Sequence, residues 1–152
     1  MKIYMDVCCL NRPFDEQTQD KVRFEAEAVI SILRRCDLGG YWSLVGSDII
    51  DLEIAKSRDI YKMQKVKLLY GIATERVKCN AAIQSRAASL RDCGAKAFDS
   101  LHLASAEFAN ADVFLTTDAQ LLNVAYRSDL KIRVANPLVY YMEVLRNEQS
   151  GN

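Results

Sequence analysis

The sequence predicts an α/β fold, a three-layer α/β/α sandwich with a central parallel sheet. Short apolar runs rich in β-branched or aromatic residues alternate with longer segments of helical periodicity along the whole chain. This alternation is typical of a parallel sheet covered by helices on both faces. Ligands of such folds bind beyond the carboxyl ends of the strands, so the residues that follow each strand are the first candidates for a functional site.

Five strands are predicted, each from a compact run of residues that suit a pleated, buried backbone. The first run stops at Asp6, and a loop that holds Asn11, Arg12 and Pro13 is expected to follow it. The last two runs are short. In chain order, the predicted strands are 3–5, 41–45, 77–79, 113–115 and 132–134.

The segments between the strands predict helices. Apolar residues recur at spacings of 4, 7, 8 and 11 in the first of them, which places them on one helical face. Ser47 and Asn136 precede helices as N-caps, and Gly39-Gly40 and Gly94 end them. The expected helices are 18–35, two within 47–73 that are parted near 57–59, 81–92, 96–109, 119–127 and a final one from 137.

Length and composition limit the number of domains and the class of protein that the sequence can encode. We expect one domain over 1–147 and a frayed C-terminal tail at 148–152. Lys and Arg together number 20, as do Asp and Glu, so nucleic-acid binding would depend on local patches of charge. Five cysteines without CxxC spacing indicate neither a zinc site nor a disulfide framework and favour reduced thiols. No apolar run approaches 18 residues, so we expect a cytoplasmic protein without a membrane partner.

Four carboxylates are candidates for a metal site. Asp6 and Asp118 each end a predicted strand, and Glu53 falls on the apolar arc of its helix. Asp99 lies near the start of the most apolar helix of the chain. Each also has an ordinary explanation, because aspartates favour turns and first helical turns, and Glu53 could be salt-bridged.

Taken together, the four acids favour a cation. A cluster of carboxylates does not stay ionised without one, because mutual repulsion raises the pKa values. Oxygen ligands suit Mg²⁺ or Mn²⁺. A metal held in this way activates water for attack on a phosphodiester, so hydrolysis of nucleic acid is the expected reaction.

Four short motifs in this order resemble a PIN domain of the kind found in VapC-type toxins of bacterial toxin–antitoxin pairs. They are Met5-Asp6 after a strand, Ser47 with Glu53 six residues on, Phe98-Asp99-Ser100-Leu101-His102-Leu103-Ala104, and Leu115-Thr116-Thr117-Asp118. The resemblance implies a Mg²⁺- or Mn²⁺-dependent endoribonuclease with its metal on Asp6, Glu53, Asp99 and Asp118, Thr116 nearby, and an antitoxin encoded next to it. Many members carry a hydroxyl residue after the first aspartate, where this chain has Val7.

Basic and amide side chains supply candidates for substrate binding. Asn11 and Arg12 follow Asp6 closely, and Arg12 could bind a phosphate or pair with Asp15 or Glu16. A basic stripe on the helix after Glu53 could follow an RNA backbone or form a solvated helix face; it comprises Arg58, Lys62 and Lys65.

The remaining polar candidates have structural interpretations as well. His102 lies among apolar residues, which favours a packed, hydrogen-bonded histidine over a catalytic base. Cys8 and Cys9 fit small core residues better than thiol chemistry, since no histidine is near them in sequence. Tyr140-Tyr141 could cover the sheet or form a homodimer contact.

Two alternatives to a ribonuclease remain open at this stage. One is another Mg²⁺-dependent phosphohydrolase, although the aspartyl-phosphate type needs a second aspartate where this chain has Cys8. The other is a PIN-like module that binds RNA or protein without cutting it. Uptake of Mn²⁺ through the four carboxylates would separate the enzyme from the binding module.

Overall fold

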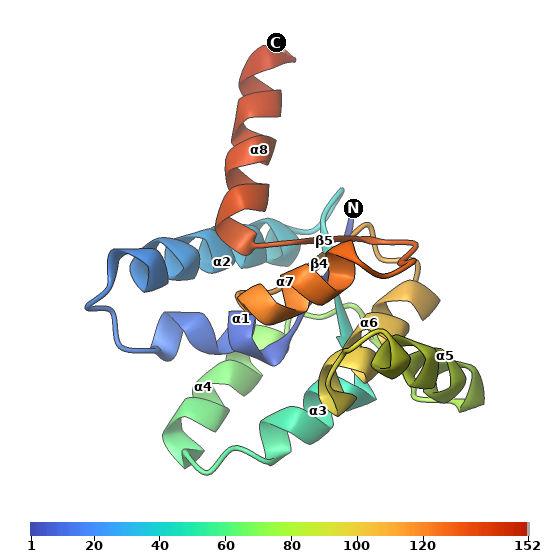
Figure 1. Ribbon diagram of the computed structural model, residues 1–152. Helices are drawn as coiled ribbons and strands as arrows, with labels where there is room; N and C mark the ends of the chain where they lie inside the picture. The colour runs from blue at the N-terminus through green and yellow to red at the C-terminus, as the bar shows by residue number, and fades with distance from the viewer. Residues whose placement is uncertain (152) are drawn as a thin grey trace.

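The computed structural model describes residues 1–151 and shows a parallel sheet with helices on both faces (Figure 1). The order of the strands across the sheet is β3-β2-β1-β4-β5, so the first strand lies at the centre. This confirms the predicted α/β fold and its central parallel sheet. The strands are β1 Lys2–Met5, β2 Ser43–Ser47, β3 Glu75–Val77, β4 Val113–Leu115 and β5 Arg133–Ala135.

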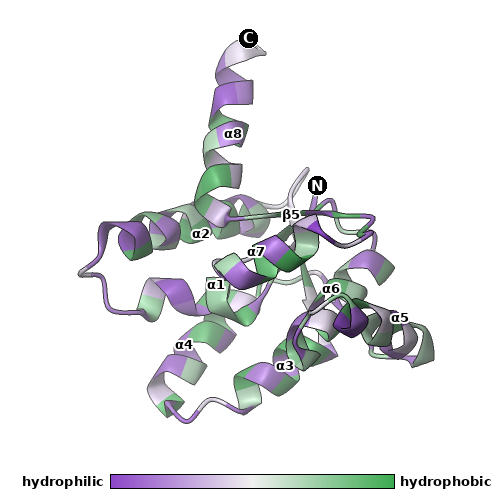
Figure 2. Cartoon of the chain, in the orientation of Figure 1, coloured by the Kyte–Doolittle hydropathy of each residue, from purple (hydrophilic) through white to green (hydrophobic). Residues whose placement is uncertain are grey.

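Helices connect successive strands and cover the sheet. Helix α2 packs against β2 and against α8, while α5 and α6 pack against each other and α7 packs against β5. Figure 2 shows hydrophobic and hydrophilic residues alternating along the helices, as expected of helices with one buried face. The helices are α1 Val7–Asn11, the 3₁₀ helix η1 Arg12–Phe14, α2 Asp20–Leu38, α3 Asp48–Ala55, α4 Ile60–Tyr70, α5 Ala81–Asp92, α6 Ala97–Phe108, α7 Ala119–Tyr126 and α8 Pro137–Ser150.

Strand β1 forms the centre of the core. Ile3, Tyr4 and Met5 have no exposed surface, and Tyr4 is in register with Val45 of β2 and Phe114 of β4. The Tyr4 and Phe114 rings stack with their centroids 5.2 Å apart. A strand with buried neighbours on both sides delivers the residue that follows it to a fixed position at the carboxyl edge of the sheet.

The segment after Asp6 is helical, where the sequence predicted a loop. Asp6 is the N-cap of α1, and its Oδ1 accepts a hydrogen bond from the backbone N–H of Cys9. The 3₁₀ helix η1 follows with Pro13 near its start. A helix of five residues is too short to show a periodic pattern, which is why the sequence did not reveal it.

The third strand lies two residues before its predicted position at 77–79. The backbone N–H of Cys79 donates to Asp48 Oδ2, and Asn80 caps α5 by accepting from the N–H of Ile83. The Cys79 amide and the Asn80 side chain are thus engaged outside the sheet, and the pairing of β3 with β2 ends at Val77.

Helix α8 projects away from the sheet (Figure 1). Asn136 caps it, as predicted, and the helix continues to Ser150, three residues past the expected end of the domain. Tyr140 is buried against Trp42 with ring centroids 6.3 Å apart, so this tyrosine helps to cover the core. Among residues 1–151, no helix is long and apolar enough to cross a membrane.

Candidate metal centre

Asp6 lies at the carboxyl end of the central strand, almost completely buried. Its backbone N–H donates to Leu115 O, which continues the pairing of β1 with β4. Its Oδ1 accepts from the N–H of Cys9 at 3.1 Å and from the thiol of Cys8 at 2.8 Å. Burial raises the pKa of Asp6, and the adjacent Cys8 raises it further, while the Thr116 hydroxyl and the Cys9 amide lower it.

Asp118 follows β4 at the same edge of the sheet and caps α7. Its Oδ1 accepts from the backbone N–H groups of Gln120 and Leu121 at 2.9 and 3.4 Å. Thr116 Oγ1 accepts from the backbone N–H of Asp118 and lies 3.4 Å from Cys8 Sγ. The end of β4 therefore lies against the side chains that follow β1.

Glu53 reaches the site from α3 and is held by His102. Its Oε1 lies 2.6 Å from His102 Nε2, and His102 Nδ1 lies 2.7 Å from the hydroxyl of Tyr4. The Tyr4 hydroxyl also contacts Ser47 Oγ at 2.7 Å. His102 is completely buried, so it is packed and hydrogen-bonded, as the sequence favoured. This chain of bonds ties the orientation of Glu53 to the central strand.

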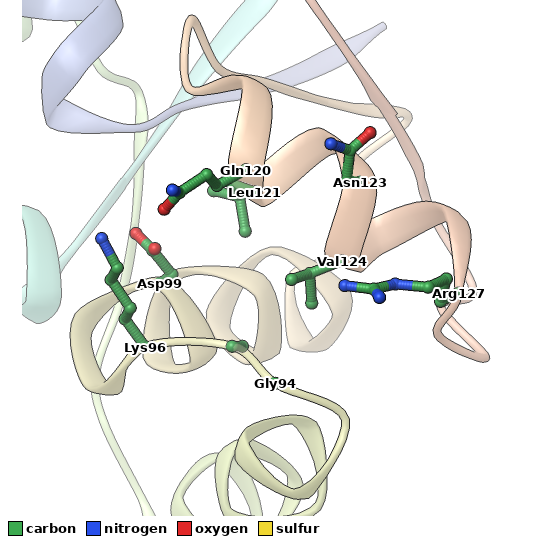
Figure 3. Close-up of a pocket in the computed structure, with 9 residues that line it drawn as sticks. Gly94, Lys96, Asp99, Gln120, Leu121, Asn123, Val124 and Arg127 are labelled. Carbon is green, nitrogen blue, oxygen red and sulfur yellow. The ribbon is translucent and has the colours of Figure 1, made fainter.

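Asp99 lies in the first turn of α6 and points toward α7 (Figure 3). It lines a pocket of about 250 Å³ between these helices, together with Lys96 and Gln120. Burial raises the pKa of Asp99, and the carboxylates of Asp118 and Glu53 raise it further. Asp99 therefore experiences the negative charges of two other predicted ligands.

The predicted acids face one part of the molecule without forming a closed cluster. Within residues 1–151, the side chains whose donor atoms all lie within 4.8 Å of one another are those of Asp6, Cys8 and Cys9, and no three of the four acids meet this limit. Mg²⁺ keeps several waters and binds through one or two carboxylates, so a wider arrangement of acids suits it.

The charge balance of the site fits a cation. In the described part of the chain, Asp6, Asp99 and Asp118 form no ion pair with Lys or Arg. Burial acts against the ionised forms of Asp6 and Asp99, and repulsion from Asp118 and Glu53 raises the pKa of Asp99 further. A hard divalent ion relieves both effects, and the oxygen donors available to it match the preference of Mg²⁺ or Mn²⁺.

Asn11 and Arg12, predicted to contact substrate, have different surroundings. Asn11 lines a pocket of about 200 Å³ beside Glu53, so it lies at the site. Arg12 donates to Glu25 Oε1 from Nε and to Asp15 Oδ2 from Nη1, at 3.0 and 3.1 Å. The guanidinium is thus held by two carboxylates, which is the structural pairing that the sequence left open, with Glu25 in the place of Glu16.

The predicted basic stripe is not continuous on one helix. Arg58 precedes α4, because Asp59 caps that helix by accepting from the N–H of Lys62. Lys62 forms a 2.5 Å ion pair with Asp15 Oδ1, and Lys65 lies over the ring of Phe14. Lys62 and Lys65 thus lie against the segment of η1 and Asp15, while Arg58 lies outside α4. The three basic residues therefore do not form the single stripe on one helix that the sequence predicted.

Sequence reasoning missed the contact between Cys8 and the acidic site. The sequence favours Cys8 as a small core residue, whereas its Sγ lies between Asp6 and the hydroxyls of Thr116 and Thr117. The cause is α1, whose helical turn brings the side chain two residues after Asp6 back to the carboxylate. Without a prediction of that helix, no sequence pattern indicates the contact.

The structure is an α/β protein with a PIN-like fold and with acidic side chains at the carboxyl edge of its sheet. Solved structures share this fold. One is a chain of VapBC2 from Rickettsia felis, in a crystal structure with a DNA fragment from the VapBC2 promoter, which superposes on this chain with a TM-score of 0.60. The identity is 14%, and the match covers 90% of this chain and 98% of that one. A chain of VapBC-1 from nontypeable Haemophilus influenzae superposes with a TM-score of 0.58 at 15% sequence identity. This match also covers 90% of this chain and 98% of that one.

The PIN-type fold that the four motifs implied is therefore confirmed. At this level of identity the similarity concerns the fold, and the roles of individual residues rest on their geometry. Neither a protein-family model nor a curated protein matches the sequence.

Proposed function

We propose that this protein is a Mg²⁺- or Mn²⁺-dependent endoribonuclease and the toxin of a VapBC-type toxin–antitoxin pair. One observation supports the nuclease most strongly: buried and half-buried carboxylates from the ends of β1 and β4 and from α6 face one region and have no Lys or Arg partner among the described residues. Side chains in this state are suited to hold a divalent cation beside a phosphodiester.

Each side chain has a distinct task in the proposed reaction. Asp6, fixed by the N–H of Cys9, and Asp99, exposed to the pocket between α6 and α7, would hold the cation. Asp118 and Glu53 would complete its surroundings, and His102 fixes the direction of the Glu53 carboxylate. When bound, the metal would supply Lewis acidity that activates water and neutralises charge on the phosphate.

The surroundings of the site suggest how RNA would be contacted, and the similar structures suggest a protein partner. Asn11 beside Glu53 and the exposed Arg58 are the side chains in the best position to contact RNA, while Lys62 and Arg12 are engaged in ion pairs. An antitoxin partner is proposed because the similar structures are of VapBC complexes.

Cleavage of a single-stranded RNA in the presence of Mg²⁺ tests the proposal. Asp6→Asn and Asp99→Asn should abolish cleavage while circular dichroism shows an intact fold. Asp20→Asn is the matched control, since it removes an exposed carboxylate whose ion pair, within residues 1–151, is with Arg23 on the same helix. Equal cleavage by clean preparations of all four proteins would overturn the proposal.

A further inference from the structure

Two thiols and one carboxylate meet at the start of α1, beside the acidic residues already described. The donor atoms of Asp6, Cys8 and Cys9 all lie within 4.8 Å of one another. Mg²⁺ does not prefer thiolate ligands, whereas Zn²⁺ binds them together with carboxylate oxygen. The proposed magnesium chemistry therefore leaves both sulfurs without a role.

We propose that Asp6, Cys8 and Cys9 form a site for a thiophilic divalent cation, represented by Zn²⁺, which overlaps the magnesium centre at Asp6. Zinc–sulfur and zinc–oxygen bonds are about 2.3 and 2.0–2.2 Å long, so ligands of one tetrahedral ion lie about 3.6–3.8 Å apart. Donors within 4.8 Å of one another reach this spacing with small side-chain rotations. Three protein ligands leave a fourth position for water.

The surroundings of Cys8 support a sulfur that carries negative charge. The backbone N–H and the hydroxyl of Thr117 both donate to Cys8 Sγ, at 3.4 and 3.1 Å. Donors of this kind orient a metal-bound thiolate and stabilise it. Cys8 is also partly exposed, so an ion can reach the group from solvent.

Cys9 closes the site from the protein side. Its side chain is completely buried, and its backbone N–H holds the Asp6 carboxylate in place. A buried thiolate is stable only beside a cation, so binding of Zn²⁺ and loss of the two thiol protons to solvent must occur together. The ion replaces these protons, and no oxidant or reductant takes part.

Shared use of Asp6 gives the site a consequence for activity. This part rests on the proposed function: an ion on Asp6 and the two sulfurs takes a carboxylate that the magnesium centre needs. Zn²⁺ then excludes Mg²⁺ or Mn²⁺, and cleavage stops while zinc is bound. The chain would thus be sensitive to free zinc through Cys8 and Cys9.

Zinc affinity is measured first, without RNA or magnesium, by competition with a chromophoric chelator under a non-thiol reductant. The wild-type chain should bind one Zn²⁺, and Cys8→Ser should weaken that binding by at least about tenfold. Cys93→Ser, which alters an exposed cysteine at the end of α5, should leave the affinity unchanged. Equal zinc affinity in wild type and Cys8→Ser would overturn the proposal.

Cd²⁺ serves as a spectroscopic probe for sulfur ligation. Its thiolate charge-transfer absorbance in the ultraviolet should appear in wild type, decrease in Cys8→Ser and disappear in Cys8→Ser/Cys9→Ser, with circular dichroism as the check on folding. Binding without this absorbance would place the ion on carboxylates alone and refute the site. Zinc binding in a chain that cleaves no RNA would instead refute only the proposed nuclease.

Discussion

Arg12→Ala should destabilise the fold, because Arg12 balances a buried charge. Glu25 is 1% exposed; its Oε1 accepts a hydrogen bond from Arg12 Nε at 3.0 Å and lies 2.9 Å from Arg12 Nη2. Its Oε2 accepts from Asn136 Nδ2, at the N-cap of α8. Removing one member of a buried ion pair costs about 3–5 kcal/mol. In the variant, Asn136 still donates a hydrogen bond to Glu25, and Arg12 is 21% exposed in the wild type. We therefore expect a loss of unfolding free energy at the lower end of this range, about 3 kcal/mol.

Urea unfolding followed by the fluorescence of Trp42, the single tryptophan, measures this free energy of unfolding. Arg23→Ala is the matched control, since Arg23 pairs with Asp20 at the surface, and we expect a loss below about 1 kcal/mol. In a Glu25→Gln background, Arg12→Ala should cost only about 1 kcal/mol, because no buried charge remains unpaired.

A loss below about 1 kcal/mol for Arg12→Ala in the wild-type background would refute the reasoning. So would an equal loss in the wild-type and Glu25→Gln backgrounds. An arginine whose task is to bind RNA would instead leave the stability unchanged and lower the RNA affinity.

Three further predictions concern buried groups near the site. Gly46→Ala should destabilise by about 1–3 kcal/mol in urea unfolding, because its Cβ would lie 2.6 Å from the hydroxyl oxygen of Tyr70, and Tyr70→Phe should reduce that cost. Burial raises the pKa of Tyr70 to about 12, against about 10 when unfolded, so the folded chain holds this proton more tightly. Stability should therefore fall as pH rises from about 10 toward 12, and fall less in Tyr70→Phe. His102→Phe should lower Mn²⁺ affinity about ten- to a hundredfold in calorimetric titration, because Glu53 loses its partner.

Each of these predictions has an outcome that would contradict it. For Gly46→Ala it is an unchanged urea midpoint, and for Tyr70 it is the same alkaline loss of stability in both proteins. For His102→Phe it is unchanged Mn²⁺ affinity. Ser105→Ala is the control for that variant, since Ser105 lies on the same helix and its buried hydroxyl has no hydrogen-bond partner within residues 1–151.

The sheet and the longer helices could be predicted because their signals are local. Strand β1 is apolar from Ile3 to Met5, and α2 repeats its apolar residues over 19 positions. Asp6 and Asp118 could be placed at one edge because parallel strands bring their carboxyl ends together. Glu53 could be placed because its neighbours on α3 define an inward arc.

The side-chain partners could not be predicted, because they depend on how elements distant in sequence pack. Nothing local shows that His102 reaches Glu53, 49 positions away, or that Cys8 Sγ lies against the hydroxyls of Thr116 and Thr117, 108 and 109 positions away. Glu25 is a different case: it lies four residues before Val29 and seven before Ile32, on the buried face of α2. This helical spacing indicates a buried acid, in the same way as the position of Glu53 on the apolar arc of α3.

Calorimetric titration with Mn²⁺ tests most directly whether the four acids form a metal centre. We expect the wild-type chain and Asp20→Asn to take up Mn²⁺ with the same affinity, and Asp6→Asn and Asp99→Asn to lose that uptake while they stay folded. Absence of Mn²⁺ binding to the wild-type chain, or equal binding by all four proteins, would contradict the account.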